Sequence, residues 1–412
     1  MEKIPEIENT NSYFNILKRS SSGRISLAII IMFFMVAIFA DFISNEKPIY
    51  CVHEGETYYP IFNSYANGLG IADLQHPDYT KEWRDIKFEK VWWPVLPYSG
   101  YTADLKNIFK SPFEKKTVIK GFGNHPLGSS ALGKDVLAGI VHGTRVALLV
   151  GICSMIIAAL FGIFFGGLAG YFGDDKVKIS WLHICLLMPF SLLGSYWAYI
   201  SSYHFDSAFL QLFFGKSILF FSIFFSMAFA ERLCIILKIK KNIALPLDLL
   251  IMRLIEVINS IPGLLLLFAL LAIIDTPSVL TLIIIIGLVR WTSIARFMRA
   301  EMLKLREIAF VQSAKVLGLS SLRTFLSHAL PNALTPVLIT IAFGIASAIL
   351  IEASLSFLSL GVSDETMTWG KMLSYARQKP SAWWLAIFPG LAIFFCVYAF
   401  NNLGEILGQK RN

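Results

Sequence analysis

Residues 299–336, RAEMLKLREIAFVQSAKVLGLSSLRTFLSHALPNALTP, form the longest polar and basic interruption in the C-terminal half of an otherwise apolar chain. Helix-forming residues fill this stretch as far as Gly318, a residue type that readily takes the left-handed conformation that ends a helix. Ser320 and Ser321 can cap a second short helix, which we expect to end before Pro331. The stretch is therefore predicted to form a helix, a tight turn and a second helix outside the lipid.

Charge predicts that this hairpin is cytoplasmic. Its Lys and Arg residues outnumber its acids, and short loops rich in Lys and Arg stay on the cytoplasmic side of a membrane. The basic residues are Arg299, Lys304, Arg306, Lys315 and Arg323, and the acids are Glu301 and Glu307. A structured basic hairpin on that side of the membrane is expected to hold a partner.

Composition indicates a polytopic membrane protein. The chain has 412 residues, of which 56% are hydrophobic and 16% charged, and its mean hydropathy is +0.63. Soluble domains carry about a quarter charged residues. The excess of 36 Lys and Arg over 28 Asp and Glu is explained by cytoplasmic loops, so no nucleic acid partner is expected.

The apolar runs predict an all-α fold with about eight transmembrane helices and both termini in the cytoplasm. Residues 1–24 are the predicted cytoplasmic N-terminus, and residues 25–43 are the first helix, which we expect to be retained and not cleaved as a signal peptide. Residues 44–140 form an external domain, and residues 141–408 form the transmembrane domain. The other helices are predicted at about 146–172, 181–203, 217–237, 247–274 with a kink at Pro262, 279–297, 337–357 and 383–403.

The external region contains two aromatic clusters, Tyr58-Tyr59-Pro60 and Trp92-Trp93-Pro94. Tyr and Trp are common where one end of a side chain meets lipid and the other meets water. These clusters predict a small ordered domain folded against the membrane surface.

Three glycines of the second predicted helix, Gly162, Gly166 and Gly170, fall on one face at GxxxG spacing. Small residues at this spacing let another helix approach closely. Glycine is also simply more frequent in membrane helices than in soluble ones. The spacing alone leaves both interpretations open.

No motif for enzyme chemistry withstands inspection. Residues 128–135, GSSALGKD, come close to a phosphate-binding loop, but Asp135 replaces the hydroxyl that would hold Mg²⁺, no strand precedes the motif, and it lies on the external side. The seven histidines are scattered without metal-ligand spacing. We therefore expect no catalytic residue, metal or cofactor site in this chain.

Ionisable residues at membrane depth are costly, by about 2.5 kcal/mol or more at a helix centre. Arg253 and Glu256 stand three residues apart in one predicted helix, and Glu352 stands alone in another. Structural pairing is one explanation for such residues. For Glu352, a cavity or a partner helix is an equal alternative.

The basic hairpin resembles the EAA loop of ABC importer permeases, E-A-A-x-x-x-G followed by I-x-L-P. The residues that carry this resemblance are Gln312-Ser313-Ala314, then Gly318, then Leu330-Pro331-Asn332. Gln312 departs from the pattern, because a neutral amide replaces the usual glutamate and weakens a contact to the ATPase by roughly half.

Further motifs resemble the dipeptide and oligopeptide branch of these permeases, in the same order along the chain. They correspond to its HPLGTDxxGRD signature, the D-x-x-x-M-R-x-x-D/E opening of a helix, the approach to the loop, and the E-A-x-L-S-F-L-G-L-G and S-W-G-x-M-L blocks. Here they read His125-Pro126-Leu127-Gly128, Gly133 and Asp135; Asp248, Met252-Arg253, Glu256 and Pro262; Trp291, Ala295-Arg296 and Arg299; Glu352-Ala353-Ser354-Leu355-Ser356-Phe357-Leu358 and Gly361; and Thr368-Trp369-Gly370 with Met372-Leu373.

The external region more loosely resembles the insert of microcin-C and oligopeptide permeases of the second-subunit type. The six-helix family core has no counterpart to the predicted hairpin 181–241, which is therefore an addition to that core.

This resemblance implies a transport subunit of the bacterial inner membrane, not an enzyme. It implies a second, similar permease in a heterodimer, an external substrate-binding protein, surrounding membrane lipid, and two cytoplasmic ATPase subunits that bind ATP and Mg²⁺ and drive peptide import. The implied ATPase-coupling residues are Gln312, Ser313, Ala314 and Gly318, whose small members let the helix enter a groove, and Arg306, Lys315 and Arg323, which can pair with acidic rims.

Other functions stay open on the sequence. The same architecture can import nickel or a peptide-like antibiotic. A secondary transporter would show an internal repeat and a charged relay at mid-membrane, and neither is clear here. A membrane scaffold or sensor would have no ATPase partner.

Overall fold

The computed structural model describes residues 20–68, 70–71, 77, 83, 85–112, 114, 125–202, 243–274, 277–362 and 366–409, with scattered positions between 218 and 237. The chain divides into two units. The first comprises Met1–Gly167 and Ile255–Asn412, and the second comprises Leu168–Leu254.

Six helices of the described chain are long and apolar enough to cross a membrane. They are α2 (Ser21–Ile38), α5 (Val136–Phe172), α6 (Trp181–Ser202), α10 (Val279–Leu305), the continuous helix Ser321–Phe357 and α15 (Trp384–Gln409). Helices α8 (Leu247–Asn259) and α9 (Gly263–Leu271) form a seventh candidate, bent by 78° at a short break. Pro262 lies in this break, so the predicted kink is confirmed. The helix predicted at 217–237 lies largely outside the described residues.

Helix α5 begins earlier than the sequence suggested. Asp135 precedes it, and its Oδ1 accepts a hydrogen bond from the N–H of Ala138 at 2.7 Å, which is the geometry of an N-cap. Residues 136–145, expected to precede the span, are therefore helical, while the boundary at 140 between the external and the transmembrane domain stays a prediction. The polar side chains His142 and Arg145 masked the helical pattern in the sequence.

Two glycines of α5 let it approach α10 closely. A Cβ on Gly166 would lie 2.2 Å from the carbonyl oxygen of Ala295, and one on Gly162 would lie 2.6 Å from the Cβ of Ile294. A side chain at either position would clash, so the two backbones meet where only glycine fits. The specific packing face is confirmed for Gly162 and Gly166.

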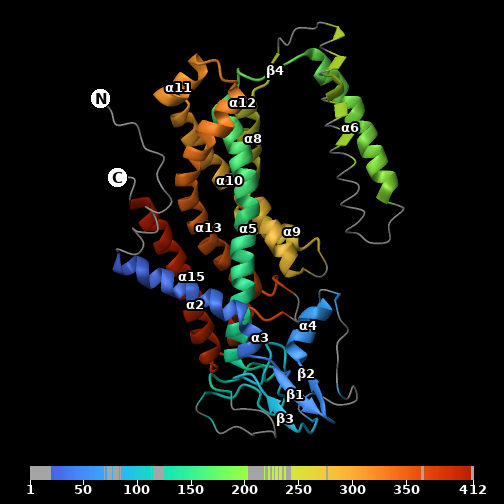
Figure 1. The fold of residues 1–412 in the computed structure, drawn as a ribbon, viewed down its shortest axis with the longest axis vertical. Helices are drawn as coiled ribbons and strands as arrows, with labels where there is room; N and C mark the ends of the chain where they lie inside the picture. The colour runs from blue at the N-terminus through green and yellow to red at the C-terminus, as the bar shows by residue number, and fades with distance from the viewer. Residues whose placement is uncertain are drawn as a thin grey trace. The chain divides into compact units, whose positions relative to one another are not determined.

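Trp369 lies in a buried apolar cluster of the first unit. It begins α14 (Trp369–Gln378) and is fully buried. Its Nε1–H donates to the carbonyl of Ile140 in α5 at 3.1 Å, and its ring meets Phe33 of α2 edge-on at 5.7 Å. Residues of α13 (Leu330–Phe357) and α15 complete this cluster, and Figure 1 shows α13 and α15 side by side with α2 across them. One indole therefore joins several helices of the first unit.

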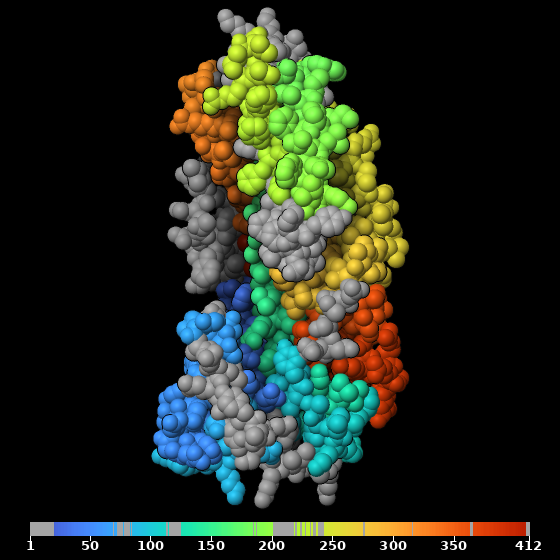
Figure 2. All heavy atoms as spheres, turned by 90° about the vertical axis from the view of Figure 1, so that its right-hand side faces the viewer, coloured from blue at the N-terminus to red at the C-terminus, as the bar shows by residue number. Residues whose placement is uncertain are grey.

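The segment after α2 folds into a small mixed region. It contains α3 (Ala40–Ile43), β1 (Tyr50–His53), β2 (Glu56–Tyr58), α4 (Pro60–Gly68) and β3 (Lys90–Trp92). The antiparallel sheet has the order β2-β1-β3, and the register places Tyr50 opposite Trp92. Figure 2 shows the blue and cyan atoms of this part gathered at one end of the first unit.

The second unit contains α6 and a short sheet. Strand β4 (Lys178–Ile179) pairs antiparallel with β5 (Ile243–Ala244), and the N–H of Leu245 donates to the carbonyl of Val177 at 2.8 Å. This pairing closes the ends of the segment that carries the predicted extra hairpin.

Candidate functional site

The predicted helical hairpin forms between α10 and α13. Helix α11 (Ala309–Val316) follows α10, and α12 (Ser321–Thr324) follows a tight turn. Gly318 in that turn has a φ of +80°, and the N–H of Leu319 donates to the carbonyl of Ala314 at 3.2 Å. This is the Schellman arrangement, in which the residue after the helix must be left-handed. The predicted stop at Gly318 and the cap at Ser320, whose Oγ accepts from Arg323 N–H, are both confirmed.

Two other expectations for the hairpin are wrong. The first helix is not continuous to Gly318, because residues 306–308 break it between α10 and α11. The second helix does not end before Pro331. Instead, α12 passes through a π-helical turn, Phe325–Ala329, into α13, where Pro331 occupies the first turn. The wide π turn accommodates a proline because the preceding carbonyls no longer crowd its ring.

The outward face of the hairpin is apolar. Val316 and Leu317 are 88% and 81% exposed, and Leu322 is 57% exposed. Val311 and Ala314 on the opposite face of α11 are buried. We call residues 309–322 the coupling tip. Sequence reasoning missed Val316 and Leu317, although two apolar residues directly before a helix-ending glycine were a visible signal.

The predicted coupling residues serve different purposes in the structure. Gln312 donates through Nε2 to the carbonyl of Arg306 at 2.8 Å, so its amide stabilises the bend between α10 and α11. Ala314 lies on the inner face of α11 and is buried within this chain, and its predicted contact with the ATPase stays a prediction. Ser313 and Arg323 are exposed. The side chain of Lys315 lies outside the described residues.

The intramembrane acid Glu352 is buried beside the motif that follows α13. Ser356 Oγ donates to its Oε1 at 2.8 Å, whereas its buried Oε2 has no hydrogen-bond partner in the described chain. A Cβ on Gly370 would lie 2.2 Å from the carbonyl of Ala353. The two sequence blocks that contain these residues therefore pack directly against each other. Glu352 therefore has a structural partner at Oε1 within its own helix, and the interpretation that it faces a cavity or a partner helix stays a prediction.

The other predicted intramembrane residues, Arg253 and Glu256, are both exposed on α8. A further cation, Arg290, lies inside α10 and has a buried Nε without a hydrogen-bond partner among the described residues.

The signature that starts at His125 builds a buried polar cluster. His125 Nδ1 lies 2.9 Å from Asp135 Oδ2, and its Nε2 lies 3.3 Å from Asp104 Oδ2. Gly133 has a φ of +68°, and a Cβ there would lie 1.8 Å from the carbonyl oxygen of Asp104. The motif that resembled a phosphate loop is thus a tight turn that caps α5.

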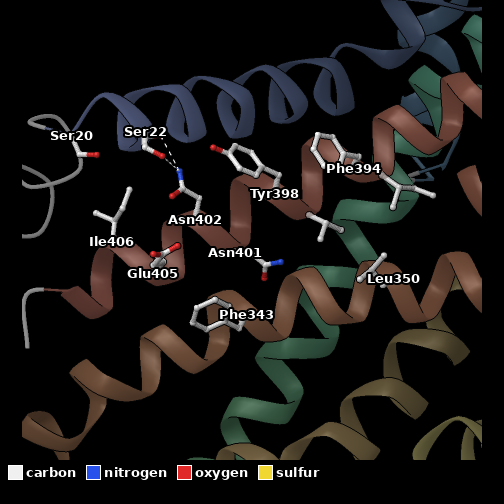
Figure 3. A pocket seen from close by; sticks show the side chains of 12 residues that line it. Ser20, Ser22, Phe343, Leu350, Phe394, Tyr398, Asn401, Asn402, Glu405 and Ile406 are labelled. Atoms are coloured by element: carbon white, nitrogen blue, oxygen red, sulfur yellow. Dashed lines mark hydrogen bonds between the residues drawn. The ribbon is translucent and has the colours of Figure 1, made fainter.

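A groove of about 840 Å³ opens between α13 and α15 near the start of α2. Figure 3 shows Phe343, Leu350 and Phe394 along it and Glu405 toward the end near Ser20. Asn402 points toward α2, with its Nδ2 3.1 Å from the carbonyl of Ser22 and 2.6 Å from Ser26 Oγ. These contacts fasten the first helix to the last.

Several apolar helices long enough to span a membrane, with a structured hairpin between two of them, define a polytopic membrane protein. Residues 233–411 match the family of binding-protein-dependent transport system inner membrane components. The matched part of the chain includes the coupling tip.

Similar curated proteins are transport permeases. The chain is 24% identical to the inner membrane ABC transporter permease protein YejE of Escherichia coli over 390 residues, covering 94% of this chain and 92% of YejE. It is 28% identical to the dipeptide transport system permease protein DppC of Alkalihalophilus pseudofirmus, covering 68% and 69%. It is 37% identical to the glutathione transport system permease protein GsiD of Shigella flexneri over 159 residues, covering 38% and 52%.

Proposed function

We propose that this chain is a permease subunit of an ATP-driven importer that moves peptides across the bacterial inner membrane. The family match at residues 233–411 supports the transport role. The names of DppC and GsiD, which specify dipeptides and glutathione, favour a peptide over nickel. The observation that carries the coupling role is the exposed apolar surface at Val316 and Leu317.

The proposed assembly contains four kinds of partner. Two cytoplasmic ATPase subunits, which bind ATP and Mg²⁺, dock on the coupling tip. A second permease completes the central path as a heterodimer, an external substrate-binding protein delivers the peptide, and membrane lipid surrounds the spans. Both termini then lie in the cytoplasm.

The geometry supports transmission of force from the tip to the spans. From Ser321 to Phe357 the helix is continuous over 37 residues, which corresponds to about 55 Å at 1.5 Å per residue. On the other side of the tip, α10 is held against α5 by contacts that leave no space at Gly162 and Gly166. A displacement of α11 by the ATPase would therefore move two spans as rigid bodies.

The docking role is tested by placing charge on the apolar surface. Each buried apolar side chain contributes about 1.5–3 kcal/mol, so Val316→Asp with Leu317→Asp is expected to prevent co-purification of the ATPase and to abolish its stimulation by peptides. Val95→Asp is the matched control, because Val95 is 85% exposed in the external region. Retention of the ATPase by the double variant would refute the proposed docking surface.

A further inference from the structure

A continuous series of aromatic rings leads out of the first membrane span. Phe39 caps the C-terminal end of α2 and lies 6.3 Å from Phe42, which lies 5.3 Å from Phe62. Phe62 lies 6.4 Å from Tyr59, and Tyr59 lies 5.5 Å from Tyr50. The rings thus connect α2, a helix long and apolar enough to cross a membrane, to strand β1.

The series ends in an open groove beside the sheet. Trp92 of β3 is the registered partner of Tyr50, so both side chains stand on the same face of the sheet. The groove has a volume of about 530 Å³. It is lined by Ile49, Tyr50, Tyr59, Phe62, Lys90, Val91 and Trp92. We call the six rings of Phe39, Phe42, Phe62, Tyr59, Tyr50 and Trp92 the aromatic ladder.

The ladder exposes more apolar surface than single scattered side chains would. Trp92 is 73% exposed, Phe62 52%, and Phe39 and Tyr59 48% each. A contiguous apolar patch of this kind marks a binding surface. The patch begins at the C-terminal end of α2, a helix long and apolar enough to cross a membrane, and Tyr and Trp are enriched where such helices meet the membrane surface.

Charge narrows the choice of ligand. Among the described residues that line the groove, Lys90 carries the one positive charge. No carboxylate lines the groove in the described chain. Residues 90 and 92 alternate with Val91 along β3, so Lys90 and Trp92 share a face. A ligand that fits has an apolar part and an anionic group, which describes a phospholipid with its phosphodiester.

The region that carries the ladder is fixed to the bundle. Arg145 of α5 donates through Nη2 to Asp41 Oδ2 at 2.8 Å and through Nε to the carbonyl of Ala37 at 3.0 Å. His142, one turn earlier, has its Nε2 2.8 Å from the carbonyl oxygen of Ser44. These bonds hold the start of the ladder at a constant position relative to α5.

We infer that the groove between α4 and β3 binds a membrane phospholipid, with the rings of the ladder against its acyl and glycerol region and the ammonium of Lys90 at its phosphate. The external region is then anchored in the leaflet at the C-terminal end of α2. This interaction does not depend on the proposed transport function.

The test uses the full chain in vesicles of phosphatidylglycerol and phosphatidylcholine brominated along the acyl chain. Bromine quenches only those tryptophans that contact lipid, and the Trp92 signal is the difference between the unmodified protein and Trp92→Phe. We expect brominated lipid to lower this signal at least about twofold relative to plain lipid, because an interfacial ring lies beside the chains. The control is the Trp83 signal, the difference in fluorescence between the unmodified protein and Trp83→Phe. Trp83 is 8% exposed in the same region, so we expect brominated lipid to leave the Trp83 signal unchanged.

Two further measurements separate the possible occupants. Lys90→Glu is expected to reduce Trp92 quenching in the anionic vesicles, whereas Lys87→Glu, at a second exposed lysine of the region, is expected to leave it unchanged. A Trp92 signal quenched by aqueous iodide and not by brominated lipid would overturn the proposal. Shielding from iodide that appears only after a substrate-binding protein is added would also overturn it, in favour of a protein docking surface.

Discussion

The coupling tip and the external aromatic region both present apolar side chains outside the spans, but they are attached in different ways. The tip joins the bundle through its two flanking helices, and nothing lies within 4 Å of a Cβ built at Gly318. The external region is fastened by side-chain hydrogen bonds from Arg145 and His142 to the segment after α2. The difference indicates a tip suited to moving with a partner and an external region suited to staying in place.

The largest effect is expected at Gly318 of the coupling tip. Gly318→Trp places a bulky residue at a φ of +80°, which costs roughly 1–2 kcal/mol for a residue with a Cβ, and it also adds bulk to the surface on which we propose that the ATPase docks. We expect transport to be abolished while the protein remains in the membrane, measured by peptide uptake and membrane content.

Gly318→Ala provides the control for this variant. It introduces the same backbone strain without the bulk, so we expect it to retain part of the transport. Normal uptake by Gly318→Trp would refute the coupling assignment.

A smaller effect is expected where α10 carries motion of the tip into the bundle. Gly166→Val puts a side chain into the backbone of Ala295, and overpacking costs about 1–3 kcal/mol. We expect a lower melting temperature in detergent and a loss of ATPase stimulation. Gly390→Ala, at a position with open space around it, should change neither property.

The attachment of the external region is predicted to depend on pH through Asp41. Burial works against the charged form, but hydrogen bonds from Tyr65 and Arg145 and the charge of Arg145 hold the pKa of Asp41 below its ordinary value of 3.8. A lowered pKa means that the stabilisation is complete above 3.8 and is lost as the pH falls through the lower folded-state value.

We therefore expect hydrogen exchange in β1 to be constant between pH 7 and 5, after correction for the intrinsic rate, and to rise only in stronger acid. Asp41→Asn should raise that exchange at neutral pH by weakening a bond worth about 1.5–3 kcal/mol. Equal protection in the variant and the unmodified protein at pH 7 would show that other contacts attach the region.

The smallest effect is expected where the first helix is fastened to the last. Asn402→Ala removes the contacts with Ser22 and Ser26, and hydrogen bonds between membrane helices average about 0.6 kcal/mol. We expect a small drop in melting temperature. Asn401→Ala, at the exposed neighbouring amide in the same groove, is the control and should have no effect.

The features that could be predicted from the sequence are those that depend on local chemistry. A glycine after a helical run predicted the left-handed end at Gly318, and the spacing of Gly162 and Gly166 indicated a close helix contact. The start of α5 was missed because its cap, Asp135, is followed by a segment whose polar residues look like a loop. Pro331 was misread because a π turn is set by the packing of the whole helix and not by the residues beside the proline. The roles of Gln312 and Ala314 depend on which face of α11 turns inward, and that is decided by tertiary contacts.

The π turn at Phe325–Ala329 also sets how far the coupling tip is rotated about the axis of α13. A π turn contains one residue more than the α pattern needs, and one residue corresponds to a rotation of about 100° around a helix axis. Removing a single residue from this turn would restore a regular α-helix and rotate Val316 and Leu317 away from their present direction while leaving their sequence intact. The direction in which Val316 and Leu317 face therefore depends on the number of residues in the π turn as well as on the side chains of the tip.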